Sequence, residues 1–162
     1  YADQVRLRIA ECSEQAGEVD RALEQYRAVA EATTTTAIST EARWHLGRIH
    51  EARGDLDKAF EWYEAAANSN NGDTAARARF QLGALHEKQE AWDKAARSYM
   101  GVAILFLHEE MSPEALWRAG QCFEKAGQTD QARKAYGELA EDFPDSPFAQ
   151  KAGEALQALG GA

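Results

Sequence analysis

The chain has 162 residues, of which 44% are hydrophobic and 28% are charged, and its formal net charge is -9. This length and composition suit a single soluble domain. The negative charge argues against a nucleic-acid or anionic-membrane surface, because both need a basic patch that displaces counterions. The only 3 prolines follow residue 112 and strong helix formers dominate, so the composition predicts helix.

No stretch of the sequence predicts a membrane span. The longest apolar run, residues 102–107, is far shorter than the roughly 20 residues that a membrane-spanning helix needs. The chain opens with Tyr1-Ala2-Asp3, without an initiator Met or the basic and apolar regions of a signal peptide. We therefore expect no membrane insertion by this segment and interpret it as a piece of a longer protein.

In chain order, the apolar periodicity predicts four pairs of helices and then a single helix. The first pair is expected over 3–16 and 19–31. The threonine run 33–36 resists helix, so we place a connection there. Ser39 or Thr40 is expected to cap a helix over 40–53, and Gly54 should turn the chain into a helix over 56–68.

The third pair departs from the others in two places. Glu90 stands where the other turns have glycine, and a left-handed non-glycine residue costs about 1–2 kcal/mol, so we expect a turn of different shape. Its second helix continues into the apolar segment 102–107. One interpretation is a long helix buried against both neighbours. The other is an exposed patch for self-association that includes Ile104, Phe106 and Leu107.

The stretch 115–144 shows the repeated unit most clearly. Ser112 is expected to cap its first helix, with Pro113 in the first turn. Ser146 and Pro147 repeat this pair 34 residues later and predict a final helix over 148–159. The outer positions of that helix are polar and suit a terminal cap, and they are Lys151, Glu154 and Gln157.

A column of small residues relates the four copies, and it consists of Ala10, Gly47, Gly83 and Gly120. The tetratricopeptide pattern has aromatic, glycine, alanine and closing proline positions. Around Gly120, these positions are filled by Trp117, Phe123, Gly127, Ala132, Tyr136 and Pro144. The chain therefore resembles the tetratricopeptide repeat family. This resemblance implies an all-α, right-handed α-α superhelix of four helical hairpins plus a C-terminal capping helix. One domain over 1–162 would hold repeats at about 3–36, 40–72, 76–109 and 113–146.

The C-terminal segment FPDSPFAQKA resembles the ending of bacterial envelope tetratricopeptide proteins. Examples are the Tol-Pal periplasmic component and the lipoprotein of the outer-membrane assembly machine. The resemblance favours a periplasmic or envelope-associated location over a cytoplasmic one. It also implies a part in a bacterial multi-protein complex.

The family resemblance further implies a concave groove lined by the first helix of each pair. Three columns of residues are expected to face it. The first column lies three residues before the small residue and is mainly aromatic, with Trp44, Phe80 and Trp117. The second lies four residues after the small residue and is acidic, with Glu14, Glu51, Glu87 and Glu124. The third column is mixed and includes Arg48 and Gln121.

These columns predict a groove that binds an amphipathic, basic peptide or protein segment. Two alternatives stay open. The aromatic residues can be partly buried against neighbouring helices, and the glutamates can form a solvated ladder with local partners, such as Arg48 with Glu51. The runner-up function is a homodimer or oligomer made through residues 102–107.

The cysteines and histidines give no sign of chemistry. Cys12 and Cys122 occupy equivalent places in the first and last pairs, on the order of 30 Å apart by helix stacking, whereas a disulfide needs about 7 Å. Both are expected to be small core residues. His50 and His86 stand at core aromatic positions, and no catalytic motif or zinc-ligand spacing is present. We expect no catalysis, no cofactor and no metal, with an unrecognised enzyme site as the remote alternative.

Overall fold

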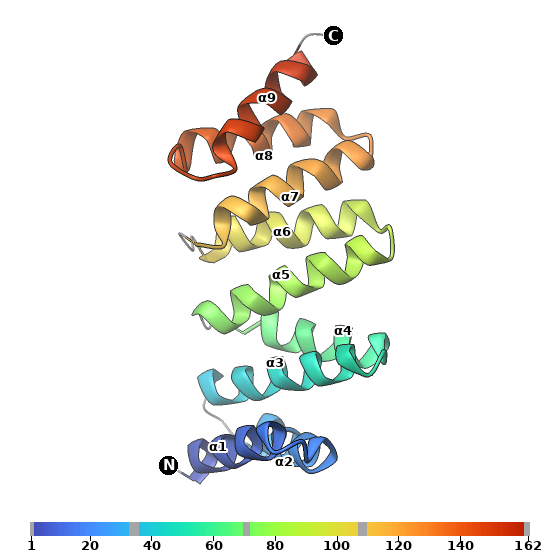
Figure 1. The fold of residues 1–162 in the computed structure, drawn as a ribbon, viewed down its shortest axis with the longest axis vertical. Coiled ribbons are helices and arrows are strands. Elements are labelled where there is room, and N and C mark those ends of the chain that lie inside the picture. The colour runs from blue at the N-terminus through green and yellow to red at the C-terminus, as the bar shows by residue number, and fades with distance from the viewer. Residues whose placement is uncertain (1, 33–35, 70–71, 107–109, 161–162) are drawn as a thin grey trace. The chain divides into compact units, whose positions relative to one another are not determined.

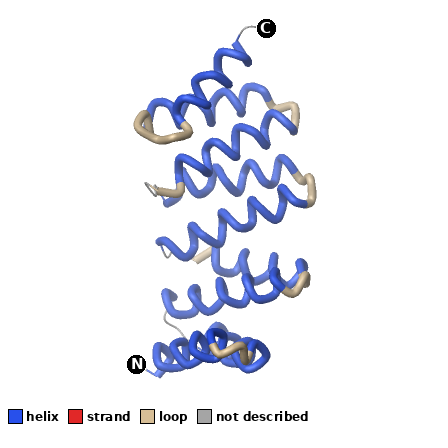
Figure 2. Tube along the Cα trace, viewed as in Figure 1, coloured by secondary structure: helices blue, strands red, loops and turns tan. Residues whose placement is uncertain are grey.

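The structure is a computed structural model, and it describes residues 2–32, 36–69, 72–106 and 110–160. These residues form helices and turns, and no strand occurs among them (Figures 1 and 2). In chain order, the helices of this part are α1 (Ala2–Gln15), α2 (Val19–Ala32), α3 (Thr36–Ala52), α4 (Leu56–Ala67), α5 (Gly72–Lys88), α6 (Trp92–Phe106), α7 (Ser112–Lys125), α8 (Thr129–Asp142) and α9 (Ala149–Gly160). The prediction of an all-α chain of consecutive helical pairs is confirmed.

The helices divide into two compact units, Tyr1–Ala78 and Arg79–Ala162. In the first unit, α1 packs on α2, α2 on α3, and α3 on α4. In the second unit, α6 packs on α7, α7 on α8, and α8 on α9. The boundary falls within α5. None of the helices in the described ranges is long and apolar enough to cross a membrane.

Each pair is built around a tyrosine of its second helix. The four tyrosines are fully buried, and they are Tyr26, Tyr63, Tyr99 and Tyr136. A Cβ atom at Gly47 would lie 2.5 Å from Cδ1 of Tyr63, and one at Gly83 would lie 2.7 Å from Cε1 of Tyr99. The small-residue column therefore exists because the tyrosine ring occupies the space that a larger side chain would need.

The turns within the pairs share one geometry. The three glycine turns have positive φ angles of 79°, 77° and 72°, at Gly17, Gly54 and Gly127. Glu90 adopts the same conformation, with φ 57°. The Ala91 N–H donates to the His86 carbonyl at 2.9 Å, as the Asp55 N–H donates to the His50 carbonyl at 3.0 Å. The expected difference in turn shape is therefore wrong, because the Schellman hydrogen bond holds Glu90 in the left-handed conformation.

The predicted N-caps at Ser39, Thr40 and Ser112 are wrong, because both helices begin earlier than expected. α3 begins at Thr36, so Ser39 and Thr40 lie inside the helix and are buried. α7 begins at Ser112 after Met111, and Ser112 is a buried helical residue. Tertiary packing of these turns outweighs the local preference of hydroxyl side chains for caps. The threonines at 33–35 lie outside the described residues.

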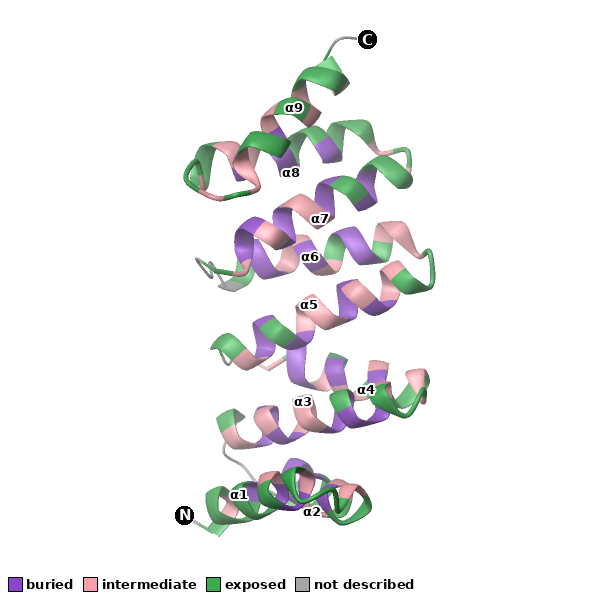
Figure 3. Ribbon diagram, in the orientation of Figure 1, coloured by how far each residue is buried: buried purple, intermediate pink, exposed green. Residues whose placement is uncertain are grey.

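The apolar end of α6 is only partly buried. Val102 and Ala103 are buried, whereas Ile104 and Leu105 are 61% and 62% exposed. The interpretation of a segment buried on every side is therefore wrong for Ile104 and Leu105. Figure 3 shows how buried and exposed residues are distributed along the helices. The Phe106 side chain and Leu107 lie outside the part of the chain that the structure describes.

The final helix begins one residue later than expected. The Phe148 N–H donates to Oγ of Ser146 at 3.1 Å, which turns the chain into α9. Ala152 is buried on the side of α9 that packs against α8. The polar positions named above, Lys151, Glu154 and Gln157, are exposed.

Candidate partner-binding site

The aromatic residue of the first unit, Trp44 on α3, is half-buried. Its ring meets His45 edge-on, with the centroids 5.1 Å apart. The Arg48 guanidinium carbon lies 4.9 Å from the Trp44 ring centroid, at cation–π distance. His45 in turn stacks on the buried Tyr26, at 4.6 Å between centroids and 8° between planes. Trp44 is thus supported by the packed core and keeps a part of its surface exposed.

The aromatic residues of the second unit have similar support. Phe80 on α5 meets Tyr99 edge-on at 5.1 Å, and Trp117 on α7 lies against Tyr136 at 5.2 Å. Both are half-buried. The Arg118 guanidinium carbon lies 5.5 Å from the Phe80 centroid. Each of these aromatic side chains therefore rests on the buried tyrosine of its own pair.

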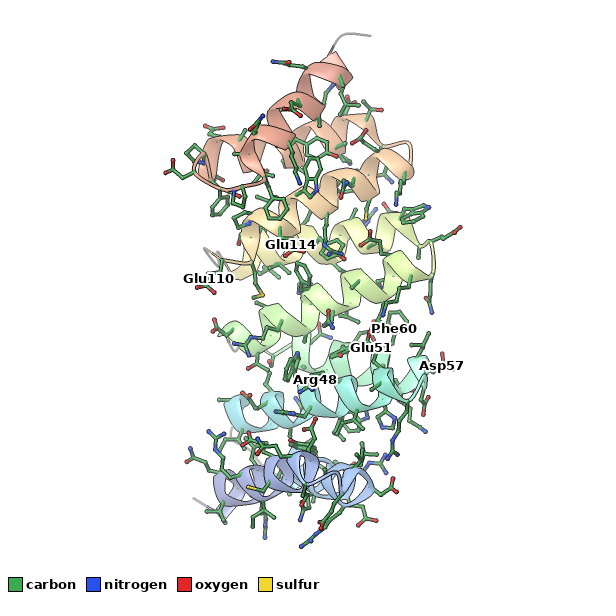
Figure 4. The ribbon with its side chains drawn as sticks, viewed as in Figure 1. Arg48, Glu51, Asp57, Phe60, Glu110 and Glu114 are labelled. Atoms are coloured by element: carbon green, nitrogen blue, oxygen red, sulfur yellow. The ribbon has the colours of Figure 1, made fainter. Side chains whose placement is uncertain are left out.

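On α3 and α7, an aromatic residue, a hydrogen-bonding residue and a glutamate follow one another at i, i+4 and i+7. They are Trp44, Arg48 and Glu51 on α3, and Trp117, Gln121 and Glu124 on α7. Seven residues are close to two helical turns, so each set lies on one helix face. Arg48 and Glu51 both project from α3 (Figure 4). Gln121 and Glu124 are exposed, and Glu51 is half-buried.

Every glutamate of the acidic column accepts a hydrogen bond from the tyrosine twelve residues later. The hydroxyl–carboxylate distances are 2.7 Å for Tyr26 and Glu14, 2.9 Å for Tyr63 and Glu51, and 2.8 Å for Tyr99 and Glu87, and Tyr136 donates to Glu124 in the same way. A tyrosine with a buried ring needs such an acceptor for its hydroxyl. Burial, together with the carboxylate, raises the pKa of Tyr26, Tyr99 and Tyr136 well above 10.

These tyrosines are functional candidates that sequence reasoning interpreted as core aromatics alone. The signal that could have identified them is the constant spacing of twelve residues between glutamate and tyrosine in all four pairs. The glutamates have a structural role as well as a potential binding role. The carboxylate column is therefore oriented by the core and is more than a solvated ladder.

In the first unit, Glu14 has two further partners on α3. Nδ1 of His45 lies 3.1 Å from Oε2 of Glu14, and Nη2 of Arg48 lies 3.6 Å from Oε1. The sequence leaves a local pair of Arg48 with Glu51 open, and the structure places the Arg48 guanidinium beside the Glu14 carboxylate of the preceding pair. Burial lowers the pKa of His45 below its usual 6.5, and the Glu14 carboxylate offsets only part of this effect.

In the second unit, Arg118 of α7 makes the corresponding contact with the preceding pair. Its Nη1 lies 3.3 Å from Oε2 of Glu87 and 3.4 Å from the Tyr99 hydroxyl. Its Nε donates to Oε1 of Glu114, also on α7, at 2.9 Å. Arg118 thereby connects α5, α6 and α7 next to Phe80, and 37% of its side chain stays exposed.

The two cysteines have different environments. Cys122 is buried as predicted, and burial raises the pKa of its thiol to about 11. Cys12 is exposed, so its predicted place in the core is wrong. The two positions are equivalent in the repeat, but α6 packs on α7, whereas no helix of the described ranges covers this side of α1.

The histidines lie in packed surroundings. His50 is buried, with Nδ1 3.4 Å from Oδ2 of Asp55, and burial lowers its pKa below 6.5. His86 is half-buried. His108 lies outside the described residues. Within the ranges that the structure describes, no group of three or more His, Cys, Asp or Glu side chains could hold a metal ion.

Comparisons with known proteins agree with this architecture. Solved structures similar to this chain include a chain assigned as a kinesin light chain with nearly identical TPR-like repeats from Podosopora anserina. It has a TM-score of 0.63 and 13% identity, over 96% of this chain and 84% of that one. Another is BtubC (BKLC) from P. vanneervenii, with a TM-score of 0.63 and 15% identity, over 93% of this chain and 68% of that one. At these identities the similarity concerns the fold alone. No curated protein sequence matches the chain.

Family models give the identification at the level of sequence. Two models of the tetratricopeptide repeat match the chain, one over residues 13–74 and the other over residues 114–146. Together they cover more than half of it. The matched residues include the buried tyrosines and small-column glycines of the second and fourth pairs. The chain belongs to the tetratricopeptide repeat family.

Proposed function

We propose that this protein is a non-catalytic scaffold that binds an amphipathic, positively charged protein segment on the first helices of its pairs. Tetratricopeptide repeats generally mediate protein–protein interaction. The observation that carries the proposal is the recurrence on α3 and α7 of a partly exposed tryptophan two turns before a glutamate. An apolar anchor of the ligand would lie on the tryptophan, and a Lys or Arg would reach the carboxylate.

The aromatic residues should supply most of the affinity. Their rings rest on the buried tyrosines, or on a histidine that stacks on one, so little side-chain entropy remains to be lost on binding. Exposed charge pairs contribute about 0–1 kcal/mol each, so the glutamates should mainly set the association rate and its salt dependence. The net charge of -9 favours a basic ligand in the same way.

In the second unit, we can assign the cationic group of the ligand to one glutamate. Glu87 already lies against Arg118, so its charge is partly neutralised. Glu124 is exposed and is oriented by the Tyr136 hydroxyl. We therefore assign the cationic group of the ligand to Glu124, with Trp117 and Gln121 beside it, and an apolar group to Phe80.

A pull-down from a lysate of the source organism tests the proposal. The native protein is compared with Trp44→Ala/Trp117→Ala and with Glu51→Lys/Glu124→Lys. Removing a buried aromatic anchor from an interface typically costs about 2 kcal/mol or more, so the tryptophan variant should lose its partners. Trp62→Ala/Trp92→Ala, which alters tryptophans of the second helices α4 and α6, is the matched control and should retain them. Capture of the same partners by all four proteins would exclude these faces as the binding site.

Self-association is the second candidate, and the exposed Ile104 and Leu105 favour it. The two large apolar side chains are neighbours at the end of α6, and exposed apolar surface of this kind is what an interaction patch is built from. Light scattering should then show a dimer that Ile104→Glu/Leu105→Glu converts to a monomer. A monomer in the native protein at high concentration would leave the first-helix site as the better proposal.

A location in the bacterial envelope, within a multi-protein complex, belongs to the same proposal. It is supported by the resemblance of the segment 143–152 to the ending of envelope tetratricopeptide proteins. Cell fractionation of the tagged full-length protein tests it. Recovery with periplasmic or membrane markers is the expected result, and recovery with cytoplasmic markers would contradict it.

A further inference from the structure

An open pocket of about 510 Å³ lies on the first unit and is lined by α2 and by the end of α3. Along α2 the lining includes Leu23, Glu24, Ala28 and Glu31, and α3 contributes His50. His50 stands six residues after Trp44 on α3, so the two side chains leave the helix about 120° apart. The pocket is therefore on a different face of α3 from the first-helix site proposed above.

His50 brings an unsatisfied polar atom to this pocket. Its residue is 6% exposed, and neither ring nitrogen has a hydrogen-bond partner within the described part of the chain, although Nδ1 lies 3.4 Å from Oδ2 of Asp55. Burial lowers the pKa of His50, so the neutral ring predominates at pH 7, with one nitrogen as a donor and the other as an acceptor. The Asp55 carboxylate favours the hydrogen on Nδ1. Nε2 is therefore a buried acceptor that lacks its donor.

The charge of the pocket indicates what kind of donor fits. Three carboxylates of α2 line it, and one of them, Asp20, is already paired with Arg53 at 2.7 Å. Glu24 and Glu31 are exposed and have no ion-pair partner among the residues that the structure describes. Leu23 adds an apolar wall between these carboxylates. A positively charged donor on an aliphatic chain would satisfy the histidine, the two glutamates and the apolar wall together.

Arg27 is the basic residue that lines the same pocket. Its charge, with that of Lys58, helps to keep His50 neutral, so its guanidinium lies near the ring without supplying the missing hydrogen bond. An anion held by Arg27 is the competing class of ligand. It fits less well, because Glu24 and Glu31 would repel it and because the neutral His50 ring presents an acceptor at Nε2.

We propose that this pocket is a binding site for an aliphatic ammonium group, which donates a hydrogen bond to Nε2 of His50 and pairs with Glu24 and Glu31. A free polyamine and the lysine side chain of another protein share this chemistry. Glu24 and Glu31 are seven residues apart and stand about 10 Å from each other along α2. A polyamine, which carries charges at intervals along an extended chain, can pair with both.

The test is a titration of 1,4-diaminobutane into the whole 162-residue chain at neutral pH and low salt, followed by the NMR signals of the histidine rings. The His50 signals, identified by their loss in His50→Phe, should move and saturate with a Kd of about 1 mM or less. 1,4-Butanediol has the same carbon chain without charge and should leave them unmoved. Nα-acetyl-lysine methylamide separates the two sources. Tighter binding than diaminobutane assigns the site to a lysine side chain, and weaker binding assigns it to a polyamine.

The histidine variant makes the test specific, with affinities measured by calorimetry. His50→Phe should weaken binding of diaminobutane about tenfold or more, because the acceptor of a charged hydrogen bond is lost. Phe123 occupies the equivalent position in the fourth pair and is buried there, so this variant should keep the fold.

Charge variants test the sign of the bound group. Glu24→Gln/Glu31→Gln should weaken binding about fivefold. Glu61→Gln/Glu64→Gln removes the same charge from exposed positions of α4 and is the matched control, which should bind as the native protein does. Arg27→Gln should bind about twofold or more tightly, because a like charge is removed from the pocket.

Three outcomes would overturn the proposal. The first is the absence of a saturable shift at a diaminobutane concentration of about 10 mM, which bounds even weak binding. The second is equal affinity of the native and His50→Phe proteins, because the amine would then be attracted to the acidic surface in general. The third is a shift of the His50 signals by inorganic phosphate that Arg27→Gln abolishes, which would assign the pocket to an anion.

Discussion

The two units contain clusters of the same plan that differ in the side chains approaching the glutamate from the next first helix. In the first unit, Tyr26 donates to Glu14, and His45 of the next first helix approaches the same carboxylate at 3.1 Å. In the second unit, Tyr99 donates to Glu87, and Arg118 approaches that carboxylate at 3.3 Å. His45 and Arg118 occupy the same repeat position, two residues before the small column.

The position two residues before the small column therefore makes a different kind of contact with the glutamate in each unit. His45 is stacked on Tyr26, and burial favours its neutral form, so its contact with Glu14 depends on pH. Arg118 is always charged and partly exposed, so its contacts with Glu87 and Glu114 depend on salt. The shared part of both clusters is the tyrosine, held against the small column and hydrogen-bonded to the glutamate.

Breaking the shared part in the second unit should have the largest effect. In Gly83→Ala the new Cβ would lie 2.7 Å from Cε1 of Tyr99, so the ring must move away from Glu87 and Arg118. We expect a loss of about 1–3 kcal/mol in the free energy of unfolding, measured by urea denaturation. Gly137→Ala on α8 is the matched control, because nothing lies within 4 Å of its Cβ. It should be neutral or stabilise by up to about 1 kcal/mol, and equal losses in both variants would contradict the packing argument.

The turns of the two units offer the next comparison. The first unit has Gly17 and Gly54 at its left-handed positions, whereas the second has Glu90 and Gly127. Glu90→Gly should raise the free energy of unfolding by about 1 kcal/mol, because glycine adopts a positive φ without the Cβ penalty. Gly54→Ala should lower stability by a similar amount. A destabilised Glu90→Gly protein in thermal unfolding would show that the Glu90 side chain contributes more than its backbone strain removes.

Removing the arginine should have a smaller effect. Arg118→Gln deletes the ion pairs with Glu87 and Glu114, and because the side chain is partly exposed we expect a loss of at most about 1 kcal/mol. The loss should shrink as salt is added, because screening already weakens the native ion pairs. Urea denaturation at low and high salt measures both values. A loss that is independent of salt would assign the role of Arg118 to packing on Phe80 and Tyr99.

The smallest expected effect is the pH dependence of the first cluster, because the Glu14 carboxylate offsets part of the burial of His45. The pKa of His45 is lower in the folded chain than the 6.5 of the unfolded chain, so the unfolded chain binds the proton first as the pH falls. Stability should therefore be constant above about pH 6.5 and decline below it. The groups that face His45 are Glu14, Arg48, Glu41 and Tyr26.

Variants separate His45 from other titrating groups. His50 has a lowered pKa for the same reason, so the pH dependence is measured in a His50→Gln background. His45→Gln in that background should flatten the decline between pH 6.5 and 5, as followed by urea denaturation at each pH. An unchanged decline would show that His45 does not titrate differently in the folded and unfolded chains.

Much of the fold could be predicted because each helical pair repeats the same pattern of residue types. Helix periodicity, the turn glycines and the small column follow from residue types at constant spacing, and Gly47 and Gly83 lie where the tyrosine rings need them. Ser39, Thr40 and Ser112 were misinterpreted as caps because capping is a local preference, while their burial is decided by packing between helices.

The candidate site was less predictable because its contacts cross between pairs. The sequence offers Glu51 on the same helix as a local partner of Arg48, whereas the structure places Arg48 beside Glu14 of α1. Cys12 was assigned to the core by analogy with Cys122, but a repeat pattern does not show whether a covering helix is present. The tyrosine–glutamate bonds were predictable in principle from their spacing. The partner-binding role of Trp44, Phe80 and Trp117 stays a prediction.

The most direct test of that role is a selection of random peptides displayed against the folded protein, followed by binding titrations with the enriched sequences. We predict peptides with aromatic or aliphatic anchors and a net positive charge, whose affinity falls about 30-fold or more in Trp44→Ala/Phe80→Ala/Trp117→Ala. The same peptides should bind Trp62→Ala/Trp92→Ala as they bind the native protein. Enrichment of acidic or wholly polar peptides, or undiminished binding to the triple variant, would contradict the assignment of the first-helix faces as the partner site.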